Sequence, residues 1–116
     1  MQNKVQNGKT IEYSPTSTAV SAGQMVLIGT LAAVAVTDIA VGDIGACETE
    51  GVFELPKASG AITQGAQLYW DADGDPAGGE AGSGCLVTSA TDNLYAGIAW
   101  ASAQAGDALI PLKLNA

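Results

Sequence analysis

The sequence predicts an all-β protein, a small antiparallel β-barrel or β-sandwich of short strands, and two observations support this fold class. Short apolar runs are separated throughout the chain by residues typical of turns, chiefly Gly, Asp, Asn and Ser. No stretch shows a sustained apolar period of about 3.6 residues between helix caps. We therefore expect many short strands and at most a short helical turn.

The expected strands follow one another along the chain with short connections. They cover residues 10–14, 24–28, 31–37, 44–55 with a break at Gly51, 66–71, 84–88, 94–101 and 107–114. Similar tripeptides stand at the start of several strands, namely Ala22-Gly23-Gln24, Val41-Gly42-Asp43, Gln64-Gly65-Ala66 and Ala105-Gly106-Asp107. Glycine supplies the backbone freedom that a tight turn into a strand requires, so these tripeptides are interpreted as turns.

Alternation predicts which side chains of two strands share a face. One apolar face would carry Leu94, Ala96, Ile98 and Trp100, and another Ala108, Ile110, Leu112 and Leu114. Pro111 cannot donate to a ladder, so the last strand is expected at a sheet edge or with a bulge. The run 31–36 is apolar without alternation, which predicts a strand that is central or buried against another subunit.

The length of the chain predicts a single domain, and its composition argues against a nucleic-acid partner. The chain of 116 residues is the size of one domain, and we expect a flexible arm over residues 1–8 and a single β domain over residues 9–116. There are 12 acidic residues and 4 lysines, with no arginine and no histidine, for a formal charge of -8. Because the chain has no basic stripe for a phosphate backbone, no nucleic-acid partner is expected.

A membrane partner is not expected either. The N-terminal stretch MQNKVQNGKT is polar and lacks the apolar core of a signal peptide. The longest apolar run, residues 25–36, is interrupted by Gly29 and Thr30 and is too short to span a bilayer.

Cys47 and Cys85 are the only cysteines, and no CxxC pair accompanies them. Without histidine or a third thiol they cannot form a zinc site of the usual kinds, and no cofactor is expected. A disulfide would need an oxidising compartment. We expect two partly buried, reduced thiols.

Asp71, Asp73 and Asp75 are the sharpest candidates for a metal site. Their alternating carboxylates, in the sequence DADGD, are similar to the start of an EF-hand calcium loop. Such a loop would need a glutamate at its twelfth position, where this chain has Gly82, and flanking helices. We therefore expect a turn that closes a hairpin, with calcium binding as the weaker alternative.

No catalytic residue is expected. Glu48, Glu50 and Glu54 could share one strand face as an acid and base pair, but a solvated strand face is the simpler interpretation. The absence of histidine leaves no usual base to activate a Ser, Thr or Cys nucleophile. The aromatic side chains could form a platform for a sugar or a peptide, although their place in predicted strands favours core packing; they are Tyr13, Phe53, Tyr69, Trp70, Tyr95 and Trp100.

Several segments, in their order along nearly the whole chain, carry a resemblance to a known family. They are EGVFELPK at 50–57, GAQLYWD at 65–71, GIA at 97–99 and AGDA at 105–108. In these segments the chain resembles the small capsid cement, or head decoration, proteins of tailed bacteriophages and prophages. The resemblance implies a compact β domain, commonly a homotrimer, that attaches outside the assembled head and reinforces contacts between major capsid subunits. It also implies a place on the virion exterior, after a period in the host cytoplasm before assembly.

The polar N-terminal arm is the candidate for attachment to the capsid. Its residues Gln2, Asn3, Lys4, Val5, Gln6 and Asn7 could lie across a neighbouring subunit and add a strand to an exposed sheet edge. The alternative function is a small ligand-binding β module, for calcium or a glycan, without catalytic activity.

Overall fold

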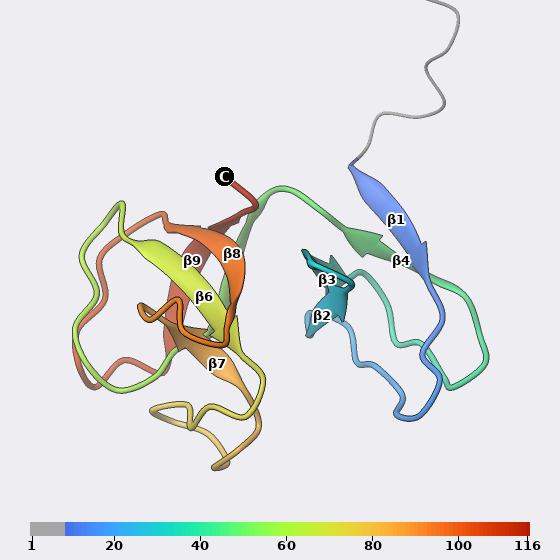
Figure 1. Cartoon of the computed structure of the whole chain (residues 1–116), viewed down its shortest axis with the longest axis horizontal. Helices are drawn as coiled ribbons and strands as arrows, with labels where there is room; N and C mark the ends of the chain where they lie inside the picture. Colours follow the sequence, from blue (N-terminus) through green and yellow to red (C-terminus); the bar gives the residue numbers. More distant parts are fainter. Residues whose placement is uncertain (1–8) are drawn as a thin grey trace, which may run out of the picture.

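The computed structural model describes residues 9–116, and within this range the chain is all-β without a helix. Two antiparallel sheets pack together, one built from the N-terminal part of the chain and the other from the rest (Figure 1). We call them the N-terminal sheet and the C-terminal sheet. The predicted all-β fold is confirmed, and it takes the form of a sandwich.

Each sheet mixes strands that are distant in the sequence. The N-terminal sheet has the order β1 (Thr10–Tyr13), β4 (Gly45–Glu48), β3 (Leu31–Ala35), β2 (Met25–Ile28). The C-terminal sheet has the order β5 (Val52–Pro56), β9 (Leu109–Leu114), β8 (Leu94–Ala99), β6 (Gln67–Asp71), β7 (Cys85–Val87). The region expected as one strand over 44–55 is divided around Gly51, and its two parts, β4 and β5, belong to different sheets.

Asn115 holds the chain where it crosses between the sheets. Its Nδ2 donates to the carbonyl of Thr49, just before the crossing, at 2.7 Å and to that of Ala32 in β3 at 2.8 Å. The Leu114 N–H donates to the Gly51 carbonyl at 2.9 Å. The end of β9 therefore ties β3 and the crossing segment together.

The C-terminal sheet bends back on itself without closing. Lys57, just past β5, forms an isolated bridge to Leu86 of β7, the strand at the opposite edge of the same sheet. The Ala58 N–H donates to the Leu86 carbonyl at 3.0 Å. No continuous ladder joins β5 to β7 within the described residues, so the sheet is not a barrel.

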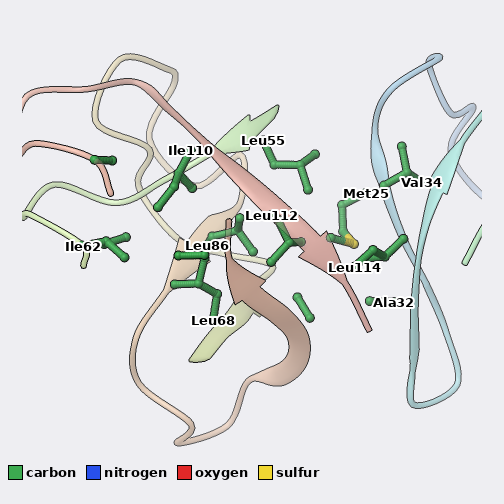
Figure 2. Packing of buried hydrophobic residues seen from close by; sticks show 13 residues of the cluster. Met25, Ala32, Val34, Leu55, Ile62, Leu68, Leu86, Ile110, Leu112 and Leu114 are labelled. Atoms are coloured by element: carbon green, nitrogen blue, oxygen red, sulfur yellow. The ribbon is translucent and has the colours of Figure 1, made fainter. Parts of the chain in front are cut away.

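One hydrophobic cluster joins the two sheets (Figure 2). Its buried members are Met25, Ala32, Val34, Leu55, Ile62, Leu68, Leu86, Ala96, Ala99, Ala103, Ile110, Leu112 and Leu114. Each buried leucine or isoleucine contributes about 1.5–3 kcal/mol relative to an exposed one. On the other side of β3, Ala33 and Ala35 pack in a second cluster with Ile39 and Cys47. Thus β3 is an interior strand buried on both faces, which is the first of the two predicted alternatives.

The four tripeptides interpreted as turns share one hydrogen bond. In each, the residue after the glycine donates its N–H to the carbonyl three residues earlier; the pairs are Gln24 to Ser21, Asp43 to Ala40, Ala66 to Thr63 and Asp107 to Gln104, at 3.0–3.1 Å. Gly65, with φ of 87°, occupies a left-handed conformation that side chains other than glycine rarely adopt. The turn interpretation is confirmed.

Lys57 is completely buried, which sequence reasoning missed. Its Nζ donates to the carbonyl oxygens of Gln104, Ala105 and Asp107 at 3.1, 3.5 and 3.3 Å. The ammonium group thus lies against the turn at 104–107, whose Gln104 N–H is held by the Asp107 carboxylate at 2.9 Å. Lysine is among the residues least often fully buried, and here backbone carbonyls replace water around its charge.

The alternation predicted for β8 is wrong beyond Ala96. Between β6 and β8 the register shifts, with Leu68 opposite Gly97 but Tyr69 opposite Tyr95, so Ala96 has no partner residue in β6. This bulge reverses the faces, because it adds one residue to a period of two. Ala96 and Ala99 both face the core, whereas Ile98 and Trp100 point outward.

The position predicted for Pro111 is also wrong. The last strand is neither at an edge nor bulged at Pro111, since β9 lies between β5 and β8. Proline is tolerated there because pairing between β8 and β9 ends at Ala99 and Leu112. The missing N–H falls beyond the ladder, and the Pro111 carbonyl still accepts the Trp100 N–H at 2.9 Å.

Candidate attachment surfaces

The first candidate surface is the edge of the N-terminal sheet formed by β1. Among the described strands β1 pairs only with β4, and the pairing continues one step toward the N-terminus, where the Thr49 N–H donates to the Lys9 carbonyl at 2.8 Å. An edge strand presents backbone groups that another chain can pair with. The candidate attachment residues Gln2, Asn3, Lys4, Val5, Gln6 and Asn7 lie outside the described residues, directly before this strand.

The second candidate surface is the outer face of the C-terminal sheet. Side chains that alternate with the core residues of β5, β8 and β9 form what we call the Trp100 face: Val52, Glu54, Ile98, Trp100, Leu109 and Lys113. Trp100 is 52% exposed, so its predicted packing in the core is wrong. The bulge at Ala96 is the reason, because it turns this end of β8 outward.

The registers of the strands determine which residues are neighbours on this face. Lys113 is opposite Val52 on one side and Ile98 on the other. Glu54 is opposite Pro111, whose carbonyl accepts the Trp100 N–H. Beside Trp100 lies a hollow of about 370 Å³, lined also by Gln64, Gly65 and Ile98. The Gln64 side-chain amide donates to the Trp100 carbonyl at 3.0 Å and fixes one wall of this hollow.

The carboxylates of the predicted turn after β6 hold its backbone. Asp71 accepts the Asp73 N–H at 3.2 Å, and Asp75 accepts the Gly82 N–H at 2.8 Å. The Gly74 N–H donates to the Asp71 carbonyl at 3.0 Å, and β6 pairs with β7 as a hairpin around this connection. Within residues 9–116 no His, Cys, Asp and Glu side chains are grouped in a way that could hold a metal ion.

The other candidate site residues are dispersed. Glu48 is in β4 and Glu54 in β5, so they belong to different sheets, and Glu50 lies in the crossing between them. Trp70 is partly buried against the core and lines a hollow of about 490 Å³ near the start of β2, where no lining side chain is charged. Trp70 and Trp100 thus lie on opposite sides of the C-terminal sheet and form no shared platform.

Both cysteines are free and fully buried, whereas the sequence predicted partly buried thiols. Burial raises the pKa of the Cys47 thiol above its ordinary value. Burial also raises the pKa of Cys85, with a further contribution from the negative charges of Asp71 and Asp75. Neither thiol is activated as a nucleophile, because raised pKa values keep both protonated at neutral pH.

Two features escaped the sequence analysis, and they differ in how well they could have been foreseen. Gly97 inside an otherwise regular strand is a signal for a bulge, and with it the outward position of Trp100. Nothing in the sequence around Lys57 signals that its side chain is buried. Within the described part of the chain, the structure contains no helix with the length and hydropathy of a membrane span.

In the part of the chain that the structure describes, these surfaces belong to a small all-β protein with a sheet edge at β1 and an exposed apolar face. A family model described as phage cement protein matches residues 5–114, which is nearly the whole chain. The chain therefore belongs to the phage cement protein family, a class of capsid-binding structural proteins rather than enzymes. No curated protein and no solved structure matches the sequence.

Proposed function

We propose that the protein is a capsid cement, or decoration, protein that binds the outer surface of the phage head. There it stabilises contacts between major capsid subunits by adding interface area. The observation that carries this proposal is the family match over residues 5–114. The compact sandwich and its exposed edge and apolar face support it, because such features serve protein–protein contact.

We propose further that the chain acts as a single domain over residues 9–116 with an attachment arm over residues 1–8. The cluster shared by both sheets supports a single domain. Eight extended residues reach up to roughly 28 Å, enough to cross a neighbouring subunit. The arm precedes the edge strand β1 in the sequence, and we propose that residues from Gln2 to Asn7 pair with a capsid strand.

The assembled partner is the major capsid protein, and the protein itself acts as a homotrimer on the exterior of the virion. Before assembly it is present in the cytoplasm of the host bacterium, whether the genome is that of a lytic phage or a prophage. The formal charge of -8 supports solubility at this stage. Repetition over a lattice allows weak individual contacts to give high occupancy.

The arm is tested by co-sedimentation with undecorated heads. Full-length protein is compared with a variant that begins at Lys9, and thermal melting of both checks that the fold is intact. We expect equal melting temperatures and much lower occupancy for the shortened variant, because strand pairing is lost from every copy. Equal occupancy would show that attachment lies elsewhere, whereas no sedimentation of the full-length protein would contradict head binding itself.

A further inference from the structure

We propose that the Trp100 face is the surface through which one copy of this protein binds another. The proposal deepens the homotrimer of the proposed function by naming its interface. It is tested in solution without capsids, so that its failure and the failure of capsid attachment are distinguishable.

The exposure of the Trp100 face is the first argument. Trp100, Leu109 and Val52 are 52%, 46% and 44% exposed, and they lie on β5 and β9 and just past β8, which are adjacent in the sheet. Trp100 is the only aromatic side chain among the large exposed hydrophobic residues described. Tryptophan is enriched among residues that dominate binding energy in protein interfaces, so its exposure here indicates a contact that the isolated chain lacks.

The bulge in β8 is the cause of this exposure. Without the extra residue at Ala96, alternation would direct Ile98 and Trp100 toward the core. The bulge requires a crowded glycine, since a Cβ at Gly97 would overlap the Lys113 carbonyl oxygen. Bulges often re-aim a side chain at a functional surface, and this one delivers two apolar side chains to the same outer face.

The charges of the Trp100 face identify its occupant as a second copy. Glu54 and Lys113 are its only charged members, and they lie diagonally on the neighbouring strands β5 and β9. Within one copy neither side chain forms an ion pair or hydrogen bond with another described residue. A ring of identical copies joins one part of a face to a different part of the next copy, and one free carboxylate beside one free ammonium group on the same face allows such head-to-tail pairing.

The rest of the chain strengthens this assignment. Copies that each carry a formal charge of -8 repel one another over most of their surfaces. The Trp100 face has no net charge, so two copies can approach there without that repulsion. Glu54 of one copy then meets Lys113 of the next, and the side chain of Trp100 is buried between the two copies.

The first test measures self-association by sedimentation equilibrium from micromolar to millimolar protein. Trp100→Ser is compared with wild type and with Ile44→Ser, which removes another exposed apolar side chain, 71% exposed and outside the Trp100 face. We expect wild type and the Ile44 variant to associate alike and Trp100→Ser to associate at least about 30-fold more weakly. Monomeric wild type, or equal association of Trp100→Ser, would overturn the proposal.

The second test uses charge reversal and does not depend on the tryptophan. Glu54→Lys and Lys113→Glu are each expected to weaken association, because like charges then meet across the interface. An equimolar mixture of the two variants should associate again, since a face with two ammonium groups then meets a face with two carboxylates. No pairing within a single chain can produce that recovery. Failure of the mixture to associate above the level of the separate variants would contradict the interface.

Discussion

At the scale of single residues, two positions, one in β8 and one just past β5, each depend on one amino acid. Gly97 has φ of 153° and lies so close to β9 that a Cβ would overlap the Lys113 carbonyl oxygen. Lys57 is fully buried and places its ammonium group among backbone carbonyls instead of water. One position depends on the absence of a side chain and the other on its full length and charge.

Replacement of Gly97 by alanine should lower the free energy of unfolding by about 3 kcal/mol, because β8 and β9 must move apart to admit the methyl group. Gly106→Ala is the matched control, since nothing lies within 4 Å of a Cβ built there. Urea denaturation of both variants measures the effect. A Gly97 variant as stable as the Gly106 variant would show that the bulge is not as tight as described.

Replacement of Lys57 by methionine, which keeps most of the side-chain volume, should lower the free energy of unfolding by about 2 kcal/mol. The carbonyl of Asp107 would lose its donor, and those of Gln104 and Ala105 would each lose one of their hydrogen bonds. Amide exchange should accelerate at Asp107, whose N–H closes the turn at 104–107. Lys9→Met, at an exposed position, is the control. Unchanged exchange at Asp107 would argue against a role of Lys57 in that turn.

At the scale of elements, local patterns predicted the strands and turns well, and non-local arrangements escaped. The glycine tripeptides form turns because their chemistry is contained within four residues. The faces of Ile98 and Trp100 depend on a bulge against β6, and the tolerance of Pro111 depends on where the β8 pairing ends. Sheet order and register set both outcomes. Gly97 signals the bulge, but the sequence of one strand does not fix its partner strands or where the pairing ends.

In the candidate surfaces too, sequence reasoning predicted the local features and missed a non-local one. Sequence reasoning identified the region after β6 as a hairpin connection, because its Asp and Gly residues are typical of turns. It placed Trp100 in the core, where an unbroken alternation would have put it. The attachment residues from Gln2 to Asn7 lie outside the described residues, so they stay a prediction.

The connection between β6 and β7 should not bind calcium with a physiological affinity. Asp71 and Asp75 already accept backbone N–H groups, and the described residues contain no group of side chains suited to a metal ion. We expect the melting temperature to be unchanged on titration with micromolar calcium. A saturable increase would contradict this expectation and favour the ligand-binding alternative, because a ligand that binds only the native state stabilises it.

At the scale of the whole molecule, one hydrophobic cluster spans both sheets, and the two buried cysteines lie outside this cluster. Cys47 packs in the cluster behind β3, and Cys85 lies beneath the connection that follows β6. Both are fully buried, so their chemistry reports on global unfolding. Thiol reagents should therefore react with either cysteine only when the chain unfolds.

Stability should fall as the pH rises above about 9. Unfolded thiols lose their protons near the ordinary pKa of 9.0, whereas burial raises the native pKa of Cys47 and Cys85. The stabilisation is thus complete below pH 9.0 and is lost toward the raised native pKa. Between these two pKa values, ionisation of each thiol in the unfolded chain lowers the free energy of unfolding by up to about 1.4 kcal/mol per pH unit.

Urea unfolding with reductant between neutral and alkaline pH measures this slope. A variant with both cysteines replaced by alanine is the control, because it lacks the two thiols and keeps every other side chain. We expect a steeper decline for wild type than for the control. Parallel curves would contradict a contribution from the buried thiols.

The central claim is that this protein reinforces a phage head, and calorimetry of undecorated heads tests it most directly. Increasing amounts of full-length protein are added, and the temperature of the capsid transition is recorded. The account predicts that the protein sediments with the heads and that the transition temperature rises until the sites are filled, because a protein that binds the assembled shell and not its dissociated subunits stabilises the shell. An unchanged transition temperature with saturating protein present would contradict it.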